Sequence, residues 1–213
     1  MNFIPEEIEN YSEAHTTSET NVLKELNRKT YAQVLNPRML SGHLQGTLLA
    51  MFSKMIKPKR ILEIGTYTGY ATQCLAQGLS DDGIIDTLEK NIELKHIIDE
   101  YFHKADLSRK IKLHVGDALQ IIPSLNYKYN LVFIDADKEN YSNYFDLIID
   151  KVSPGGFIIA DNVLWSGKVI QPIDEKDIDT KAIIEFNQKI QHDKRVFNLL
   201  LPVRDGLMLM QKL

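Results

Sequence analysis

The sequence predicts an α/β fold, namely a doubly wound, mostly parallel, Rossmann-like sheet that is preceded by helices and ends in an antiparallel hairpin. Three patterns support this prediction. Arg60–Thr72 has the pattern of a short apolar strand, a turn containing Gly65 and Gly69, and the start of a helix. Strand and helix patterns then alternate as far as Ala160. Near the end of the chain, two apolar runs flank an Asp-Gly turn, which is typical of a β-hairpin.

The N-terminal 57 residues are expected to be helical and to form a lid and dimerisation segment in front of a main domain at 58–213. Capping residues at His15–Glu19 precede an apolar series at helical spacing, and Pro37 is expected to end that helix. After a break, apolar residues from Leu44 to Ile56 again have helical spacing. These apolar stripes are also what ordinary core packing would produce.

The main domain is expected to begin with its first strand at residue 60. The predicted strands are 60–64, 84–88, 111–115, 130–134 and 157–160, with hairpin strands at 195–201 and 207–212. The predicted helices are about 70–79, 91–104, 116–123 and 141–152, and Pro154–Gly156 is expected to form a turn. Strands that alternate with helices in this way indicate a parallel sheet covered on both faces.

Composition sets broad limits on function. The chain has 213 residues, of which 44% are hydrophobic and 25% are charged, which suits a single folded domain. Apolar runs stay far shorter than the ~18 residues of a membrane span, and the N-terminus lacks the pattern of a secretory signal. The one cysteine, Cys74, is compatible with a reducing cytoplasm, the location we expect. The net charge of −4 argues against broad nucleic-acid binding.

The glycine turn after the first strand is expected to bind a ligand without a pyrophosphate group. It lacks the Gly-Lys-Ser/Thr of a P-loop and the third glycine of the dinucleotide motif. Glu63 precedes Gly65 by two residues, and a carboxylate there would repel a pyrophosphate but suit a cationic ligand such as S-adenosylmethionine. Glu89 ends the next strand, where an acid typically accepts hydrogen bonds from a ribose diol. The alternative is an ordinary turn with acids on the surface.

Oxygen-bearing side chains follow the fourth and fifth predicted strands. Asp135 ends one strand, and Asp161 and Asn162 end its expected neighbour, so all three should lie in one small volume. Two carboxylates and an amide oxygen favour a hard cation such as Mg²⁺, Mn²⁺ or Ca²⁺. The alternative is that one acid caps a helix and the other faces water. We prefer that alternative for Asp137, which should point away from Asp135.

Two further residues near this site have candidate roles. Lys138 is three residues past Asp135 and can point back toward the same volume, where a neighbouring cation would favour its neutral form and let it act as a base. Its alternative is a solvated surface lysine. Trp165 follows Asn162 closely and can line a pocket for an aromatic substrate, or it can simply be part of the core.

These motifs together resemble one enzyme family along essentially the whole chain. The segments LEIGTYTGYAT, FIDADKENY, IIADNVLWSGKV and LPVRDGLMLMQKL resemble, in order, the cofactor motif, the two metal motifs and the closing hairpin of class I S-adenosylmethionine-dependent O-methyltransferases of the divalent-cation-dependent group. That group includes catechol and caffeoyl-coenzyme A O-methyltransferases and bacterial relatives. RMLSGHLQG resembles the segment that folds over the methionine part of the cofactor.

Carried over by position, the resemblance implies roles for individual residues. Asp135, Asp161 and Asn162 become metal ligands and Lys138 the general base. Glu89 becomes the ribose ligand, and Trp165 stays a candidate for the substrate pocket. Further cofactor contacts are implied at Met39, Ser41, Glu63, Gly65, Tyr67, Tyr70, Ala71, Asp117, Ala118 and Asp135. The segment at 166–178 is shorter than the acceptor-recognition loop of the plant caffeoyl-coenzyme A enzymes, which argues against a coenzyme A ester as the acceptor here.

The expected function is therefore metal-dependent methyl transfer to a hydroxyl of a small, catechol-like aromatic acceptor, by a protein that forms homodimers and does not bind membranes. A first alternative is methylation of a hydroxylated uridine in tRNA, supported weakly by the basic residues Lys24, Arg28, Lys29 and Arg38. A second alternative is a cofactor-binding scaffold without activity, against which the intact set of candidate catalytic residues argues. The sequence leaves the acceptor itself open.

Overall fold

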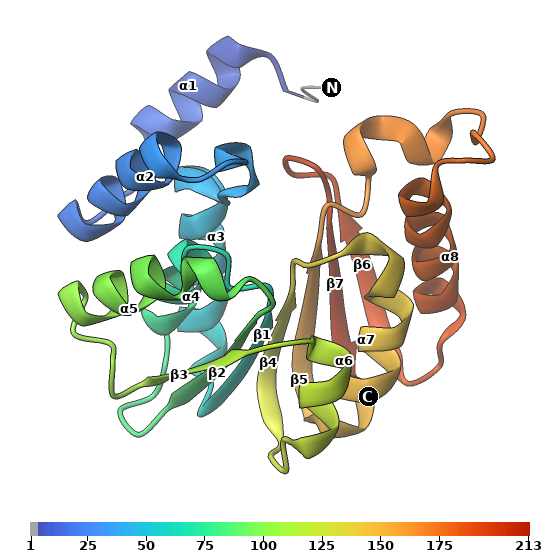
Figure 1. Ribbon diagram of the computed structural model, residues 1–213. Helices are drawn as coiled ribbons and strands as arrows, with labels where there is room; N and C mark the ends of the chain where they lie inside the picture. Colours follow the sequence, from blue (N-terminus) through green and yellow to red (C-terminus); the bar gives the residue numbers. More distant parts are fainter. Residues whose placement is uncertain (1–3) are drawn as a thin grey trace.

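The protein is described here by a computed structural model that covers residues 4–213. Within them the strands are β1 (Arg60–Ile64), β2 (Ile84–Glu89), β3 (Ile111–Val115), β4 (Tyr129–Ile134), β5 (Val152–Asp161), β6 (Val196–Leu201) and β7 (Leu207–Lys212). These seven strands form one sheet in the order β3-β2-β1-β4-β5-β7-β6 (Figure 1). All neighbours are parallel except β7, which is antiparallel to both β5 and β6. The predicted fold class is thereby confirmed.

Helices cover both faces of this sheet (Figure 1). The α-helices are α1 (Glu6–Ala14), α2 (Asn21–Gln33), α3 (Gly42–Ile56), α4 (Tyr70–Ala76), α5 (Lys95–Lys104), α6 (Ala118–Ile121), α7 (Tyr141–Ile148) and α8 (Ile178–His192). Short 3-10 helices are η1 (Pro37–Met39), η2 (Ile92–Leu94), η3 (Ile122–Ser124), η4 (Lys138–Asn140), η5 (Ile149–Lys151) and η6 (Trp165–Ile170). Helices α2–α5 pack on one face and α6–α8 on the other.

The central strands are apolar at nearly every position because both of their faces are covered. Successive side chains of a strand point to opposite faces. Ile61 and Phe133 therefore pack in the core under α2–α5, while their neighbours Leu62 and Val132 pack in the core under α6–α8. Glu63 lies on the same face as Ile61, below α4, and is the polar exception in β1. The two cores together fix the sheet from both sides.

The register of the parallel strands brings their carboxyl ends to one edge of the sheet. Ile64 is the partner of Ile134, and Ile134 is the partner of Ala160. Gly65, Asp135 and Asp161 follow directly. The chains approach closely at this edge, since a Cβ atom on Gly65 would lie 1.9 Å from the carbonyl oxygen of Asp135 and its φ of +102° favours glycine. The register of the parallel strands thus determines the edge at which the candidate functional residues meet.

Some predicted boundaries are wrong. Helix α2 starts after Thr20, whose hydroxyl accepts a hydrogen bond from the Leu23 N–H, so Thr20 is the cap rather than His15–Glu19. The residues before Pro37 are not helical beyond Gln33. Strand β5 begins at Val152 and runs through Pro154–Gly156, where its pairing with β4 is shifted. The turn predicted from the Pro-Gly-Gly sequence is thus part of an irregular strand.

Helix α8 lies outside the predicted elements, although Ile183, Phe186 and Ile190 have helical spacing and are buried. Asp177 caps its N-terminus by accepting a hydrogen bond from the Thr180 N–H at 3.1 Å. None of the helices within residues 4–213 is long and apolar enough to cross a membrane.

Candidate active site

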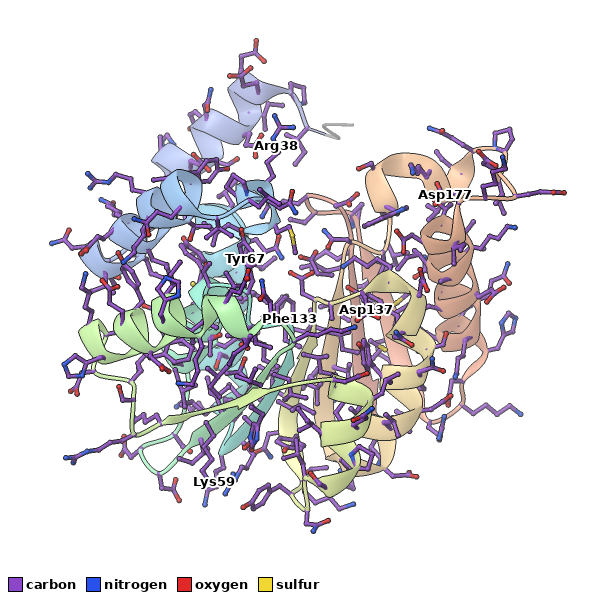
Figure 2. All side chains as sticks on the ribbon, viewed as in Figure 1. Arg38, Lys59, Tyr67, Phe133, Asp137 and Asp177 are labelled. Carbon is purple, nitrogen blue, oxygen red and sulfur yellow. The ribbon has the colours of Figure 1, made fainter. Side chains whose placement is uncertain are left out.

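A cavity of about 920 Å³ lies at the carboxyl edge of the sheet, a volume typical of a small-molecule site. Figure 2 shows Tyr67 and Asp137 near this edge and Lys59, just before β1, at the opposite end of the sheet. Twelve of the predicted site residues line the cavity: Met39, Ser41, Gly65, Tyr67, Glu89, Asp117, Ala118, Asp135, Lys138, Asp161, Asn162 and Trp165. The structure therefore brings most of the predicted site together, from segments spread over the whole chain.

One side of the cavity is built around Glu89, at the end of β2. Its carboxylate accepts hydrogen bonds from the backbone N–H groups of Tyr67 at 2.7 Å and Asn91 at 2.8 Å. Burial raises the pKa of Glu89, and the backbone hydrogen bonds partly oppose that rise. A carboxylate has about four acceptor positions, so Glu89 keeps two for a ligand hydroxyl pair. The geometry is compatible with the predicted ribose contact.

Tyr67 links this side to the N-terminal segment. Its backbone is left-handed, with a φ of 53°, and its N–H donates to Glu89. Its hydroxyl donates to the carbonyl oxygen of Asn36 at 2.9 Å. Asp117 closes the same side by accepting the Leu119 N–H at 2.9 Å as the cap of α6. Residues from 36 to 117 in the sequence thus form one wall.

Three predicted cofactor residues do not reach the cavity wall. Glu63 is 0% exposed, and its Oε2 accepts hydrogen bonds from the hydroxyls of Thr72 and Thr87, the second at 2.5 Å. Burial raises the pKa of Glu63 to about 8, so this group is mostly neutral at pH 7 rather than the carboxylate that we assumed. Tyr70 donates to Glu19 at 2.5 Å, and Ala71 is buried in α4. Direct side-chain contact with a ligand is not supported for these three residues.

The opposite side of the cavity is an oxygen cluster centred on Lys138. The Lys138 Nζ lies 3.2 Å from Asp135 Oδ1, 2.9 Å from Asn162 Oδ1 and 2.5 Å from the Tyr141 hydroxyl oxygen. The lysine is only 7% exposed, which corrects the alternative of a solvated surface side chain. Tyr141 donates in turn to the backbone carbonyl of Asp161 at 2.9 Å. The amine is therefore held in place on several sides.

Asp161 completes this cluster. It is 3% exposed, and burial, with a further contribution from the Asp135 carboxylate, raises its pKa well above the ordinary range. Its Oδ1 accepts the Asn162 N–H at 2.7 Å, and its Oδ2 accepts a hydrogen bond from the Gln45 amide. Two carboxylates so close together need a positive charge beside them, and in this structure the Lys138 ammonium supplies it.

The donor set fits a hard divalent cation. Asp135, Asp161 and Asn162 offer two carboxylates and one amide oxygen, the oxygen ligands that Mg²⁺ or Ca²⁺ prefers. Within residues 4–213, His, Cys, Asp and Glu form no group of three or more that could bind a metal, so the amide is needed to complete this set. Asp137 lies outside the cluster, as expected, since it accepts the Tyr144 hydroxyl at 2.5 Å and an amide N–H of Asn140.

Trp165 lines the cavity with its indole ring centred 5.8 Å from Lys138 Nζ. The residue is partly exposed rather than fully in the core. Its indole N–H is buried and has no hydrogen-bond partner among the described residues. An aromatic wall beside the candidate base suits a flat substrate.

Sequence reasoning missed three residues that hold the oxygen cluster. Gln45 from α3 and Tyr141 from α7 bond to Asp161, and Arg204 from the β6–β7 loop bonds to Gln45 at 2.8 Å. Each of the three lies in a segment that resembles a family motif, Gln45 in RMLSGHLQG, Tyr141 in FIDADKENY and Arg204 in LPVRDGLMLMQKL, but none was given a role of its own. Their contacts could not be predicted from these segments, because the segments meet only in the folded chain.

Comparison with known proteins agrees with this geometry. The sequence model of a family described as O-methyltransferase matches residues 12–213. The chain belongs to this family. It is 35% identical to caffeoyl-CoA O-methyltransferase 5 of Nicotiana tabacum over 90% of this chain and 84% of that protein. It is 36% identical to caffeoyl-CoA O-methyltransferase 2 of Eucalyptus globulus over 89% of this chain and 81% of that protein.

Solved structures give the same result. The O-methyltransferase from Bacillus cereus, in complex with SAH, superimposes with a TM-score of 0.90 at 30% identity and covers 97% of each chain. The SAH-bound methyltransferase PaMTH1 of Podospora anserina has a TM-score of 0.90 at 28% identity and covers 100% of this chain and 99% of its own. The protein is therefore an S-adenosylmethionine-dependent O-methyltransferase of the caffeoyl-CoA O-methyltransferase type.

Proposed function

We propose that this methyltransferase acts on a hydroxyl of a small catechol-like aromatic acceptor and depends on a divalent cation, with Mg²⁺ the first candidate and Mn²⁺ or Ca²⁺ the alternatives. The observation that carries the proposal is the position of Lys138. Its amine is buried between Asp135 and Asn162 and beside the Trp165 ring, in a cavity large enough for a nucleoside cofactor and an aromatic ring.

Each residue of the oxygen cluster has a role in this proposal. Asp135, Asp161 and Asn162 would hold the cation, which when bound lowers the pKa of an acceptor hydroxyl. Lys138 accepts the proton of that hydroxyl, and Tyr141 and Asn162 fix the direction of its amine. Trp165 holds the acceptor ring flat against the cavity wall. Positioning of this kind supplies a large part of the rate gain in group transfer.

The other side of the cavity would hold S-adenosylmethionine. Glu89 accepts hydrogen bonds from the ribose, Gly65 lets the ligand approach the backbone, and Asp117 and Ala118 border the base. The buried Glu63 does not touch the ligand in this proposal. It lies below the glycine turn with an oxygen, Oε1, that has no hydrogen-bond partner among residues 4–213, and it responds to the positive charge of the cofactor through the protein.

Removal of the metal tests this function. Methyl transfer from S-adenosylmethionine to catechols should stop with a chelator and return with Mg²⁺ or Mn²⁺. Asp161→Ala should lose activity and weaken Mn²⁺ binding to the protein, measured by calorimetry, while it still binds S-adenosylmethionine. Full turnover in excess chelator would contradict the metal dependence.

The tRNA alternative gains no support from the relatives compared above. Acids also lie among its basic residues, since Lys29 Nζ is 2.5 Å from Glu100, and Glu25 on the same helix pairs with Lys104 at 2.5 Å. A surface with interleaved acids is a poor contact for a phosphate backbone.

The N-terminal segment supports our proposal of a lid and a homodimer. Met39 and Ser41 line the cavity, which suits a lid. Helix α1 contains no buried residue, and Ile8, Tyr11 and Leu35 are exposed, with Leu35 at 94%. Exposed apolar side chains on this segment are available for an interface. Light scattering should give about twice the chain mass, and removal of residues 1–36 should abolish the dimer. A fully active monomer would contradict this arrangement.

A further inference from the structure

Among residues 4–213, four cationic side chains line the cavity, and only Lys138 forms an ion pair with a carboxylate. Lys138 belongs to the oxygen cluster, and Lys90 follows Glu89 at the end of β2. Arg38 of η1 and Arg204 of the β6–β7 loop form no ion pair with any residue in 4–213. Figure 2 places Arg38 above the carboxyl edge of the sheet. These two guanidinium groups need an explanation that the methyl-transfer chemistry does not supply.

The backbone of Arg204 is in an unusual conformation for an arginine. Its φ is 50°, in the left-handed region where glycine or asparagine is normally found. The loop around it is held to the segment after β5, because Val163 N–H donates to Gly206 O at 3.1 Å and Leu164 N–H donates to Asp205 O at 2.9 Å. An arginine at a position that disfavours it suggests that the side chain has a function.

The Arg204 guanidinium is tied to the candidate metal site through one residue. Its NH1 donates to Gln45 Oε1 at 2.8 Å, and the Gln45 amide donates to Asp161. Gln45 is 3% exposed, so this chain of hydrogen bonds is fixed in direction. The guanidinium therefore lies on the order of 7 Å from the Asp161 carboxylate, which is two hydrogen bonds and one amide away.

Most of the hydrogen-bonding capacity of Arg204 is unused. A guanidinium has five N–H donors, and within residues 4–213 only the one to Gln45 is engaged by a side chain. Arg38 makes no side-chain hydrogen bond or ion pair within the same residues, and it directly precedes Met39 on the cavity wall. Asp179 of α8 also lines the cavity but forms no ion pair with Arg204. Unused donors of a planar guanidinium are well suited to a carboxylate.

We propose that Arg204, with Arg38 as a second contact, binds a carboxylate on the methyl acceptor, so that the substrate class is an aromatic acid with two adjacent ring hydroxyls rather than a neutral catechol. This inference rests on the proposed function, because it assumes that the hydroxyls lie at Asp135, Asp161 and Lys138. One aromatic ring with a short acid group spans the distance from that cluster to the guanidinium.

The test compares 3,4-dihydroxybenzoate with its methyl ester, which carries one more methyl group and no charge. Calorimetry measures their binding to the protein loaded with Mg²⁺ and S-adenosylhomocysteine, so that binding is observed without turnover. The acid should bind more tightly than the ester. Arg204→Met should weaken binding of the acid by about 10- to 100-fold and leave the ester unchanged, because a charged hydrogen-bond pair is lost.

Three further variants complete the experiment. Arg204→Lys should retain part of the preference, because it keeps the charge but not the planar donor pair. Arg38→Met should reduce the preference for the acid over the ester by a smaller factor than Arg204→Met does. Arg28→Met on α2, an exposed cation outside the cavity, is the matched control and should change neither affinity. Thermal unfolding of each variant shows whether it is folded.

Equal binding of the acid and the ester by the native protein would overturn the proposal, as would equal weakening of both by Arg204→Met. Tighter binding of the coenzyme A thioester of 3,4-dihydroxycinnamate than of the free cinnamate would also overturn it, in favour of a phosphate contact. Preferential binding of the acid without methyl transfer to it would support the Arg204 site and count against the proposed function. The two failures are therefore distinguishable.

Discussion

The two sides of the cavity are built in different ways. The proposed cofactor side comes mainly from the part of the chain between Gly65 and Ala118, and its centre is the Glu89 carboxylate, held by backbone N–H groups. The proposed acceptor side brings together Gln45, Lys138, Asp161 and Arg204 from distant segments, and its side chains contact one another.

Because of this difference, substitutions on the two sides of the cavity should have different effects. A ligand held by the Glu89 carboxylate, which backbone N–H groups keep in place, should lose affinity when that carboxylate is removed. The proposed acceptor side depends on a network in which buried charges balance one another, so the loss of one member also disturbs its neighbours. We therefore expect substitutions on the proposed acceptor side to change mainly kcat, and substitutions on the proposed cofactor side to change mainly the affinity for the cofactor.

The largest effect is expected at Lys138, which lies on the proposed acceptor side. Lys138→Met removes the proposed base while it keeps most of the side-chain volume. We expect kcat to fall by about 10²- to 10⁴-fold, the usual loss for a general base. The affinity for S-adenosylhomocysteine, measured by calorimetry, should change by less than about threefold, since Lys138 does not contact Glu89 or the glycine turn.

Lys54→Met, on the exposed face of α3, is the matched control for this loss of a positive charge and should be as active as the native protein. A Lys138→Met variant that keeps its kcat, or that loses cofactor binding as strongly as activity, would break the separation between the two sides.

Sequence reasoning found most of the residues that line the cavity, for a physical reason. The strand, the glycine turn and the acid at the end of the next strand are local patterns, and parallel strands bring their carboxyl ends to one edge. The oxygen cluster followed from the same rule, because Asp135 and Asp161 end neighbouring strands. The partners Gln45 and Arg204 could not be found in this way, since only tertiary packing places α3 and the β6–β7 loop beside Asp161.

Glu63 shows a different limit of sequence reasoning. Its distance from Gly65 in the sequence suggested a carboxylate that faces the ligand, but the alternation of β1 turns it into the core under α4. Burial then changes its protonation, which no spacing rule shows. The N-terminal boundaries failed for a related reason, since the cap at Thr20 depends on where α2 packs and not on the richest cluster of capping residues.

A smaller effect is expected on the cofactor side. Glu89→Ala removes the acceptor for a ribose hydroxyl pair and releases the N–H groups of Tyr67 and Asn91. We expect the affinity for S-adenosylmethionine to fall by about 10- to 100-fold, which corresponds to about 1–3 kcal/mol for an unsatisfied polar contact. At saturating cofactor, kcat should be close to native. Unchanged affinity in calorimetry would count against the ribose contact.

The smallest effect concerns Glu63, which lies between the two sides and senses the charge of both. Its pKa is raised by burial to about 8 from an unfolded value of 4.5. Between these values the folded protein holds a proton that the unfolded chain has released. The stabilisation from this proton is therefore complete below pH 4.5 and is lost as the pH rises to about 8, with a slope of at most about 1.4 kcal/mol per pH unit.

Glu63→Gln stays neutral at every pH and can still accept hydrogen bonds from Thr72 and Thr87. The decline in the free energy of unfolding between pH 5 and about 8 should therefore become shallower in this variant than in the native protein, as measured by urea unfolding at a series of pH values. Saturating S-adenosylmethionine should also flatten the native curve, because its positive charges favour the ionised Glu63 and lower the folded pKa. Glu100→Gln, whose carboxylate is exposed and has a lowered pKa, should not flatten this window and serves as the control. Identical slopes for Glu63→Gln and the native protein would mean that Glu63 is ionised in the fold, and that the cofactor side carries a negative charge in its core after all.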